Sequence, residues 1–142
     1  MKLYFSGGAH HSHDNLIELL RSAGWLIVDP AYTQEGELID WGQAHRTLID
    51  GQVEGLVAEV TGGGDAGVGH DIGLAVAHRI PVICLFRGDL NGLTDKFACV
   101  HKIGYGLDPG KHPAREIYDQ DKPRIIQAIS LAVSSRALKA SG

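Results

Sequence analysis

The stretch "GLVAEVTGGGDAGVGHDIGLAVAHRIPVICLFR", residues 55–87, contains the segments that decide the fold. It opens with a short apolar run at 55–60 and closes with a denser one at 80–86, and both runs are typical of buried strands. Between them, a glycine-rich segment precedes apolar residues at helical spacing near 72–77. A strand, a helix and a second strand in this order predict a pair of parallel strands joined by a crossover helix.

The same alternation continues on both sides of this stretch. We predict further strands at 3–6, 25–28 and 100–105. Helices are predicted from Ser12 or Asp14 to a stop at Gly24, at 38–50, at 93–98, and from Pro123 to about Leu138, followed by a frayed tail. Residues 1–142 are therefore predicted to form a single α/β domain. Its expected architecture is a doubly wound, flavodoxin-like, five-stranded parallel sheet with helices on both faces.

Composition and charge narrow the classes of function. Of the 142 residues, 44% are hydrophobic and 21% are charged, and the net charge of −4 includes no block of like charges. This balance argues against nucleic acid or a membrane surface as the main partner. No apolar run reaches the roughly 20 residues of a membrane span, and the apolar start is too short for a signal peptide. We therefore expect a cytoplasmic protein.

The cysteines and histidines of the sequence are the candidates for binding a metal ion. Cys84 lies within an apolar run and is expected to be a buried structural thiol, and neither it nor Cys99 has the CxxC spacing of a structural zinc site. The cluster from His10 to His13 is open to two interpretations, a metal site or polar anion-binding loop residues, and we favour the second. We predict no metal and no cofactor.

Two loops follow predicted strands at the edge of the sheet where ligands of such folds bind. They span Gly7–His13 and Thr61–Gly69, and they border one crevice if the two strands are neighbours. Glycines there let the backbone approach a phosphate, a ribose or a carboxylate, and the next helix N-terminus offers free N–H groups. A turn without a ligand is the alternative, because a lone G-x-G-x-x-G match after the third strand is a weak signal.

Two acidic residues flank the second loop. Asp71 is expected in the first turn of the following helix, where it either complements the helix dipole or points a carboxylate into the crevice. Glu59 ends a predicted strand and either faces the same crevice or caps a sheet edge.

A family resemblance rests on these motifs. The segment "AEVTGGGDAGVGHDIGLAVAHRIPVICLFR" resembles the 2′-deoxynucleoside 5′-phosphate N-hydrolases and, more distantly, the nucleoside 2-deoxyribosyltransferases. Their pattern is Ala-Glu-Val-Thr, a short variable stretch, Gly-Val-Gly-Tyr-Glu-Leu-Gly, and a strand ending Cys-Leu-Phe-Arg. The opening "LYFSGG" is similar to the first strand of that family. The likeness is strong over 55–87, fair over 3–14 and weak elsewhere.

The resemblance implies an activity. In that family a glutamate attacks C1′ of a deoxyribose and displaces the base, and water or a second base then completes hydrolysis or transfer. The chemistry is that of retaining glycosidases, with a nucleophile and a proton donor on either side of the scissile bond. The resemblance also implies a homodimer whose active sites take residues from both subunits.

The resemblance also assigns roles to particular residues. Asp71 takes the place of the nucleophilic glutamate, one methylene shorter, and Tyr4 that of the tyrosine that orients it. The position of the family's second acid holds Arg46, a candidate to bind a phosphate or a base, and the neighbouring His45 is a candidate proton donor. The remaining candidates would surround the sugar phosphate: Gly7, Gly8, His10, Gly63, Gly64, Gly67 and, near a serine lent by the partner subunit, Thr94.

Three hypotheses follow from these observations. The first is hydrolysis of the N-glycosidic bond of a (deoxy)nucleoside 5′-monophosphate, which releases base and sugar phosphate. The second is exchange of bases by a nucleoside 2-deoxyribosyltransferase, which loss of the family's phosphate-binding arginine and serine favours. The third is a nucleotide-binding module without catalysis, which the substituted acids favour. The sequence does not specify the base, or ribose against deoxyribose.

Overall fold

The computed structural model describes residues 1–7, 14–29, 41–50, 52–60, 66–87, 101–105 and 117–141. The elements are β1 (Lys2–Gly7), α1 (Asp14–Ser22), β2 (Leu26–Val28), α2 (Trp41–Asp50), β3 (Gly55–Val60), α3 (Ala66–Ala77), β4 (Val82–Arg87), β5 (His101–Tyr105) and α4 (Asp121–Ser141). From β1 to β4 the strands and helices alternate along the chain, which confirms the predicted α/β class.

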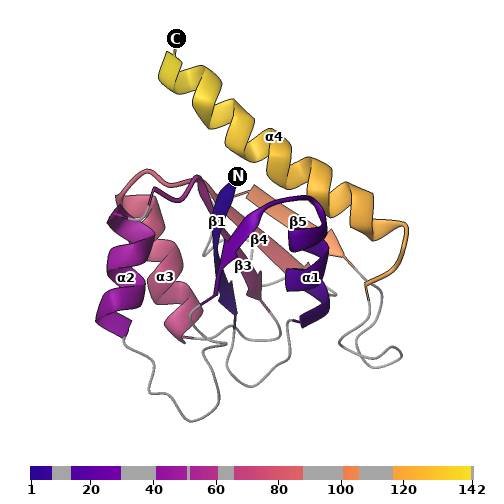
Figure 1. Ribbon diagram of the computed structural model, residues 1–142, viewed down its shortest axis with the longest axis horizontal. Helices are drawn as coiled ribbons and strands as arrows, with labels where there is room; N and C mark the ends of the chain where they lie inside the picture. The colour runs from indigo at the N-terminus through magenta and orange to yellow at the C-terminus, as the bar shows by residue number, and fades with distance from the viewer. Residues whose placement is uncertain are drawn as a thin grey trace.

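The strands pair in parallel in the order β2-β1-β3-β4-β5, so all their carboxyl ends point to one edge of the sheet (Figure 1). β1 lies directly beside β3, with Tyr4 opposite Leu56 and Gly7 opposite Glu59. This is the neighbour relation that a shared crevice requires. From this pair the strand order leads to β2 on one side and to β4 and β5 on the other. In doubly wound sheets, ligands bind beyond the carboxyl ends of such a pair, which is called the switch point.

Side-chain alternation along β1 separates two hydrophobic cores. Leu3 and Phe5 pack on one face of the sheet with residues of α1 and α4, while Tyr4 packs on the other with residues of α2 and α3. Figure 1 shows the two helix pairs on opposite sides of the strands. Ser6 shares the face of Tyr4, because it lies two residues further along the same strand.

The helix α3 begins earlier than predicted, and this changes the position of Asp71 within the helix. The helix begins at Ala66, so Gly67 and Gly69 lie inside it and the predicted loop over 61–69 was too long. Asp71 consequently lies in the second turn rather than the first. The low helix propensity of glycine is overridden because Val68, Ile72 and Ala75 bury one side of the helix.

The other boundaries differ less. α4 begins just before Pro123, which fits the tolerance of proline in a first helical turn, but it continues past the predicted end at Leu138. Cys84 is buried, as predicted. The predicted helix at 93–98, Cys99 and residues 38–40 lie outside the described residues.

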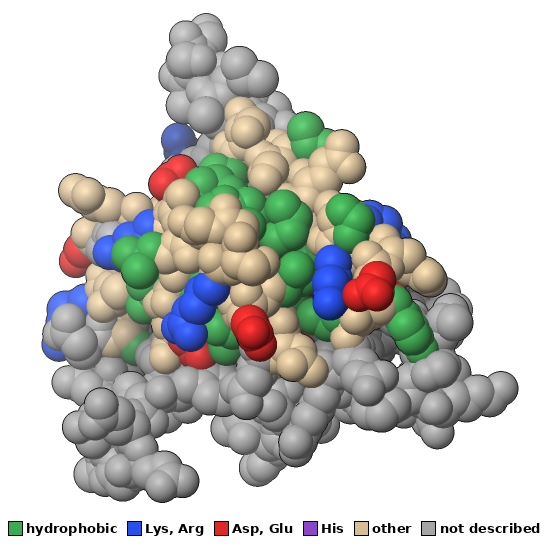
Figure 2. Space-filling view, turned by 45° about the vertical axis from the view of Figure 1, so that its right-hand side comes forward, with side chains coloured by type: hydrophobic (Ala, Val, Ile, Leu, Met, Phe, Trp, Pro, Cys, Tyr) green, Lys and Arg blue, Asp and Glu red, His purple; other side chains and the backbone are tan. Residues whose placement is uncertain are grey.

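Among the described residues, no helix combines the length and the hydropathy needed to cross a membrane. On the face shown in Figure 2, hydrophobic, basic and acidic side chains are interspersed over the described surface. This mixture agrees with the absence of like-charge blocks in the sequence.

Candidate functional site

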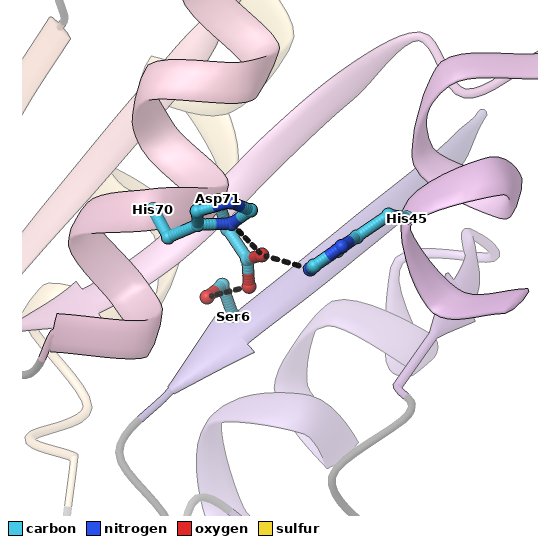
Figure 3. Close-up of polar contacts among 4 residues, drawn as sticks. All are labelled: Ser6, His45, His70 and Asp71. Carbon is cyan, nitrogen blue, oxygen red and sulfur yellow. Dashed lines mark hydrogen bonds and ion pairs between the residues drawn. The ribbon is translucent and has the colours of Figure 1, made fainter. Parts of the chain in front are cut away.

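The carboxylate of Asp71 is the centre of the candidate site. It projects from α3 toward β1, and the residue is only 5% exposed. The buried hydroxyl of Ser6 donates a hydrogen bond of 2.7 Å to its Oδ2 atom. Ser6 is the penultimate residue of β1, so this contact lies at the carboxyl edge of the sheet where β1 adjoins β3 (Figure 3).

Two histidines approach the other oxygen of the same carboxylate. Nε2 of His45, on α2, lies 3.4 Å from Oδ1 of Asp71, and Nδ1 of His70 lies 3.9 Å from it. The two imidazole rings are 4.7 Å apart between centroids and tilted by 33°. The carboxylate is thus held on one side by a strand hydroxyl and faces imidazoles from two helices on the other (Figure 3).

The packing of α2 explains why His45 reaches this point. Ala44 and Leu48, one turn apart on the helix, are buried, which fixes the side of α2 that faces the protein. His45 follows Ala44 and is 28% exposed, so it lies at the border of this buried side. Arg46, a further 100° around the helix, is exposed. Of these two candidates, therefore, it is His45 whose side chain approaches Asp71.

Tyr4 lies beneath the site on the same face of β1 as Ser6. It is fully buried, and within the described structure its hydroxyl has no hydrogen-bond partner. Burial raises the pKa of Tyr4 well above its ordinary value, and the negative charges of Asp71 and Asp29 raise it further. The hydroxyl is therefore protonated at neutral pH, and two carboxylates lie within electrostatic reach of it.

The expected contact between Tyr4 and Asp71 is not formed, because Ser6 makes it instead. Alternation along the strand could have revealed Ser6, since residues two apart at a strand end share a face. His70 and Asp29 also belong to the surroundings of the site, and the sequence reading gave neither a role. Asp29 follows β2, the strand that pairs with β1.

Replacing Tyr4 by phenylalanine tests the state of this hydroxyl. We expect Tyr4→Phe to leave the free energy of unfolding unchanged or to raise it by up to about 1 kcal/mol, because it removes a desolvated group without breaking a hydrogen bond. Denaturant unfolding measures the change. Tyr4→Ala is the matched variant, with an expected loss of about 3–5 kcal/mol from the emptied ring site. A loss above about 1 kcal/mol in Tyr4→Phe would show that the hydroxyl is hydrogen-bonded in solution.

Glu59 lies on the other face of the sheet from Asp71. Alternation along β3 places it with Val57, on the α1 and α4 face, whereas Asp71 approaches the opposite face. It is buried near the carboxyl end of β3, a strand that lies between β1 and β4. Glu59 therefore does not share the face of the sheet that the Asp71 carboxylate approaches.

The predicted phosphate-binding residues are described only in part. Gly7 ends β1 at the same edge as Ser6, and Gly67 lies in the first turn of α3 rather than in a loop. The structure thus brings Asp71, Tyr4 and His45 together, with Gly7 at the same edge. The other predicted members lie outside the described residues: Gly8, His10, Gly63, Gly64 and Thr94.

One group in the described ranges has the donors to hold a metal ion. It consists of His45, His70 and Asp71, whose donor atoms all lie within 4.8 Å of one another.

Neither a scan against protein-family models nor a search of the curated proteins finds a match to this chain.

Proposed function

We propose that this protein is an N-glycosidase that hydrolyses the bond between C1′ and the base of a (deoxy)nucleoside 5′-monophosphate, with Asp71 as nucleophile. The observation that carries the proposal is a buried carboxylate, oriented by Ser6, at the β1–β3 switch point. The strand order and the two hydrophobic cores also support the doubly wound, flavodoxin-like architecture of the N-hydrolase family that the sequence resembles.

The proposed reaction has two steps. A carboxylate oxygen of Asp71 attacks C1′, the C1′–N bond breaks, and its electron pair leaves with the base, which takes a proton from His45. Water then attacks C1′ of the resulting ester and gives a proton to neutral His45. Sugar phosphate is released and the carboxylate is restored.

The separation of the reacting groups bears on this mechanism. Nε2 of His45 lies 3.4 Å from the proposed nucleophile, whereas the paired groups of retaining glycosidases are about 5–5.5 Å apart. His45 must therefore turn away from Asp71 when a sugar enters, and its partial exposure gives it a solvent side to turn toward. In its protonated form, Asp29, which like Asp71 acts electrostatically on Tyr4, is the alternative proton donor.

Charge at the site suits an anionic substrate. His45 and His70 lie beside Asp71, and Arg46 follows on α2. The two imidazoles offer hydrogen-bonding groups to a 5′-phosphate at the site, and the exposed Arg46 offers a cation at its border. The family resemblance further implies a homodimer that completes the phosphate site near Thr94, for which sedimentation velocity is the direct measurement.

Incubation with a panel of nucleotides and nucleosides tests the proposal, with released base measured by chromatography. Base release from nucleoside monophosphates alone is the expected result. Base exchange on addition of a second base, with nucleosides accepted, would instead identify a deoxyribosyltransferase. Calorimetric binding of nucleotides without any product would contradict catalysis and favour a binding module.

A further inference from the structure

We propose that His45, His70 and Asp71 bind one divalent transition-metal ion, and that Zn²⁺ is the ion these donors fit best. This site goes beyond the proposed glycosidase, which uses no metal. It is built from two imidazole nitrogens and one carboxylate oxygen that converge from α2 and α3 (Figure 3).

The spacing of the donors suits a single ion. Ligands about 2.0–2.1 Å from a tetrahedral zinc ion lie about 3.3 Å from one another. The 3.4 Å between Nε2 of His45 and Oδ1 of Asp71 already matches this value. Nδ1 of His70 lies 3.9 Å from the same oxygen, and all three donor atoms lie within 4.8 Å of one another. To complete the site, the 60% exposed side chain of His70 must therefore rotate toward the other two ligands.

Ser6 supplies the outer support that metal sites in proteins require. Its hydroxyl holds Oδ2 of Asp71 at 2.7 Å, so that Oδ1 is directed toward the two imidazoles. Such a hydrogen bond to a ligating carboxylate fixes the orientation of the ligand before an ion arrives. Because both Ser6 and Asp71 are buried, the carboxylate is fixed in place, while the exposed ring of His70 provides a path for entry.

The chemistry of the donors selects the class of ion. Two imidazoles and one carboxylate suit zinc and its neighbours in the first transition row, whereas Mg²⁺ and Ca²⁺ prefer oxygen ligands. Three protein ligands leave the fourth position of a tetrahedral ion for water, as in catalytic rather than structural zinc sites.

The consequence for activity rests on the proposed function. An ion on Oδ1 of Asp71 occupies an oxygen of the nucleophile and a nitrogen of the proton donor. Bound metal and glycosidic cleavage then exclude each other, so zinc acts as an inhibitor of base release.

The test is titration of the purified full-length chain with Zn²⁺ by calorimetry, and with Co²⁺ by visible absorption, whose intensity reports the coordination number. We expect one ion per chain. His70→Ala should weaken Zn²⁺ binding by more than about 10-fold, the least that loss of even an outer partner of a metal ligand brings about. His78→Ala is the matched control, because His78 is an exposed histidine that follows the end of α3 and should leave the affinity unchanged.

The outcomes separate the metal site from the glycosidase. An unchanged Zn²⁺ affinity and stoichiometry in the double variant His45→Ala/His70→Ala would overturn the site, as would failure of the wild-type chain to bind Zn²⁺ or Co²⁺. Tight binding lost in these variants supports the site even where no nucleotide is cleaved, and in that case only the proposed function fails. Where base is released, inhibition by Zn²⁺ that His70→Ala relieves supports the regulatory consequence, and undiminished release by the zinc-loaded protein contradicts it.

Discussion

Asp71→Asn is expected to lower the rate of base release by at least about 1,000-fold, on the scale of losses seen when an essential catalytic group is removed. The amide has nearly the shape of the carboxylate, and it can still accept a hydrogen bond from Ser6. It is, however, a far weaker nucleophile, so the glycosyl ester does not form. The measurement is single-turnover release of base from the nucleotide preferred in the panel.

Asp121→Asn is the matched control for this substitution. Asp121 is also buried, but it begins α4 and binds Arg124 at 2.9 Å, so the same chemical change is made away from the proposed site. Its rate per folded molecule should equal that of the wild type. Circular dichroism should show that both variants are folded. A folded Asp71→Asn protein that releases base at the wild-type rate would eliminate Asp71 as nucleophile.

His45→Gln is expected to reduce the rate by about 10²–10⁴-fold, the usual contribution of a general acid. Glutamine preserves a hydrogen-bonding side chain near Asp71 but cannot donate a proton to the departing base. In a single turnover, the reduction in leaving-group release should nearly vanish with a substrate whose leaving group needs no proton, such as a nitrophenyl glycoside of the same sugar phosphate, because the first step then takes no proton from His45. Asp71→Asn should remain slow with that substrate, because attack at C1′ is still required.

Two further variants make this experiment decisive. His78→Gln changes an exposed histidine that follows the end of α3 and should keep the wild-type rate. Asp29→Asn tests the other candidate donor that the structure brings toward Tyr4. Loss of activity in Asp29→Asn, with activity retained in His45→Gln, would transfer the role of proton donor to Asp29 and contradict the assignment of His45.

Local sequence patterns predicted which strands and helices form better than they predicted where each one begins and ends. The apolar runs that became β1, β3 and β4 are visible in the sequence because parallel strands are buried on both faces. The start of α3 was misplaced because local glycine content suggests a loop, whereas burial of Val68, Ile72 and Ala75 favours a helix. That error of a few residues placed Asp71 one turn too early.

The sequence predicted the central residue of the candidate site and some, but not all, of its neighbours. Asp71 and His45 were singled out, and their atoms lie 3.4 Å apart although they are 26 positions apart in sequence. Ser6 was missed although it makes the closest contact to the carboxylate, at 2.7 Å. The resemblance assigned the orienting role to Tyr4. The partner of a buried side chain depends on how far that side chain extends within the packed interior, and a sequence pattern does not give this distance.

The sequence by itself determined that strands and helices alternate and that an acid follows the glycine-rich segment, because hydrophobic periodicity and glycine content are local properties. Only the tertiary structure decided which groups surround that acid. The parallel pairing of β1 with β3 and the packing of α2 beside α3 bring Ser6, His45 and His70 to one carboxylate. Contacts of this kind form because apolar faces that are distant in sequence are buried against one sheet, and that burial is a property of the whole chain.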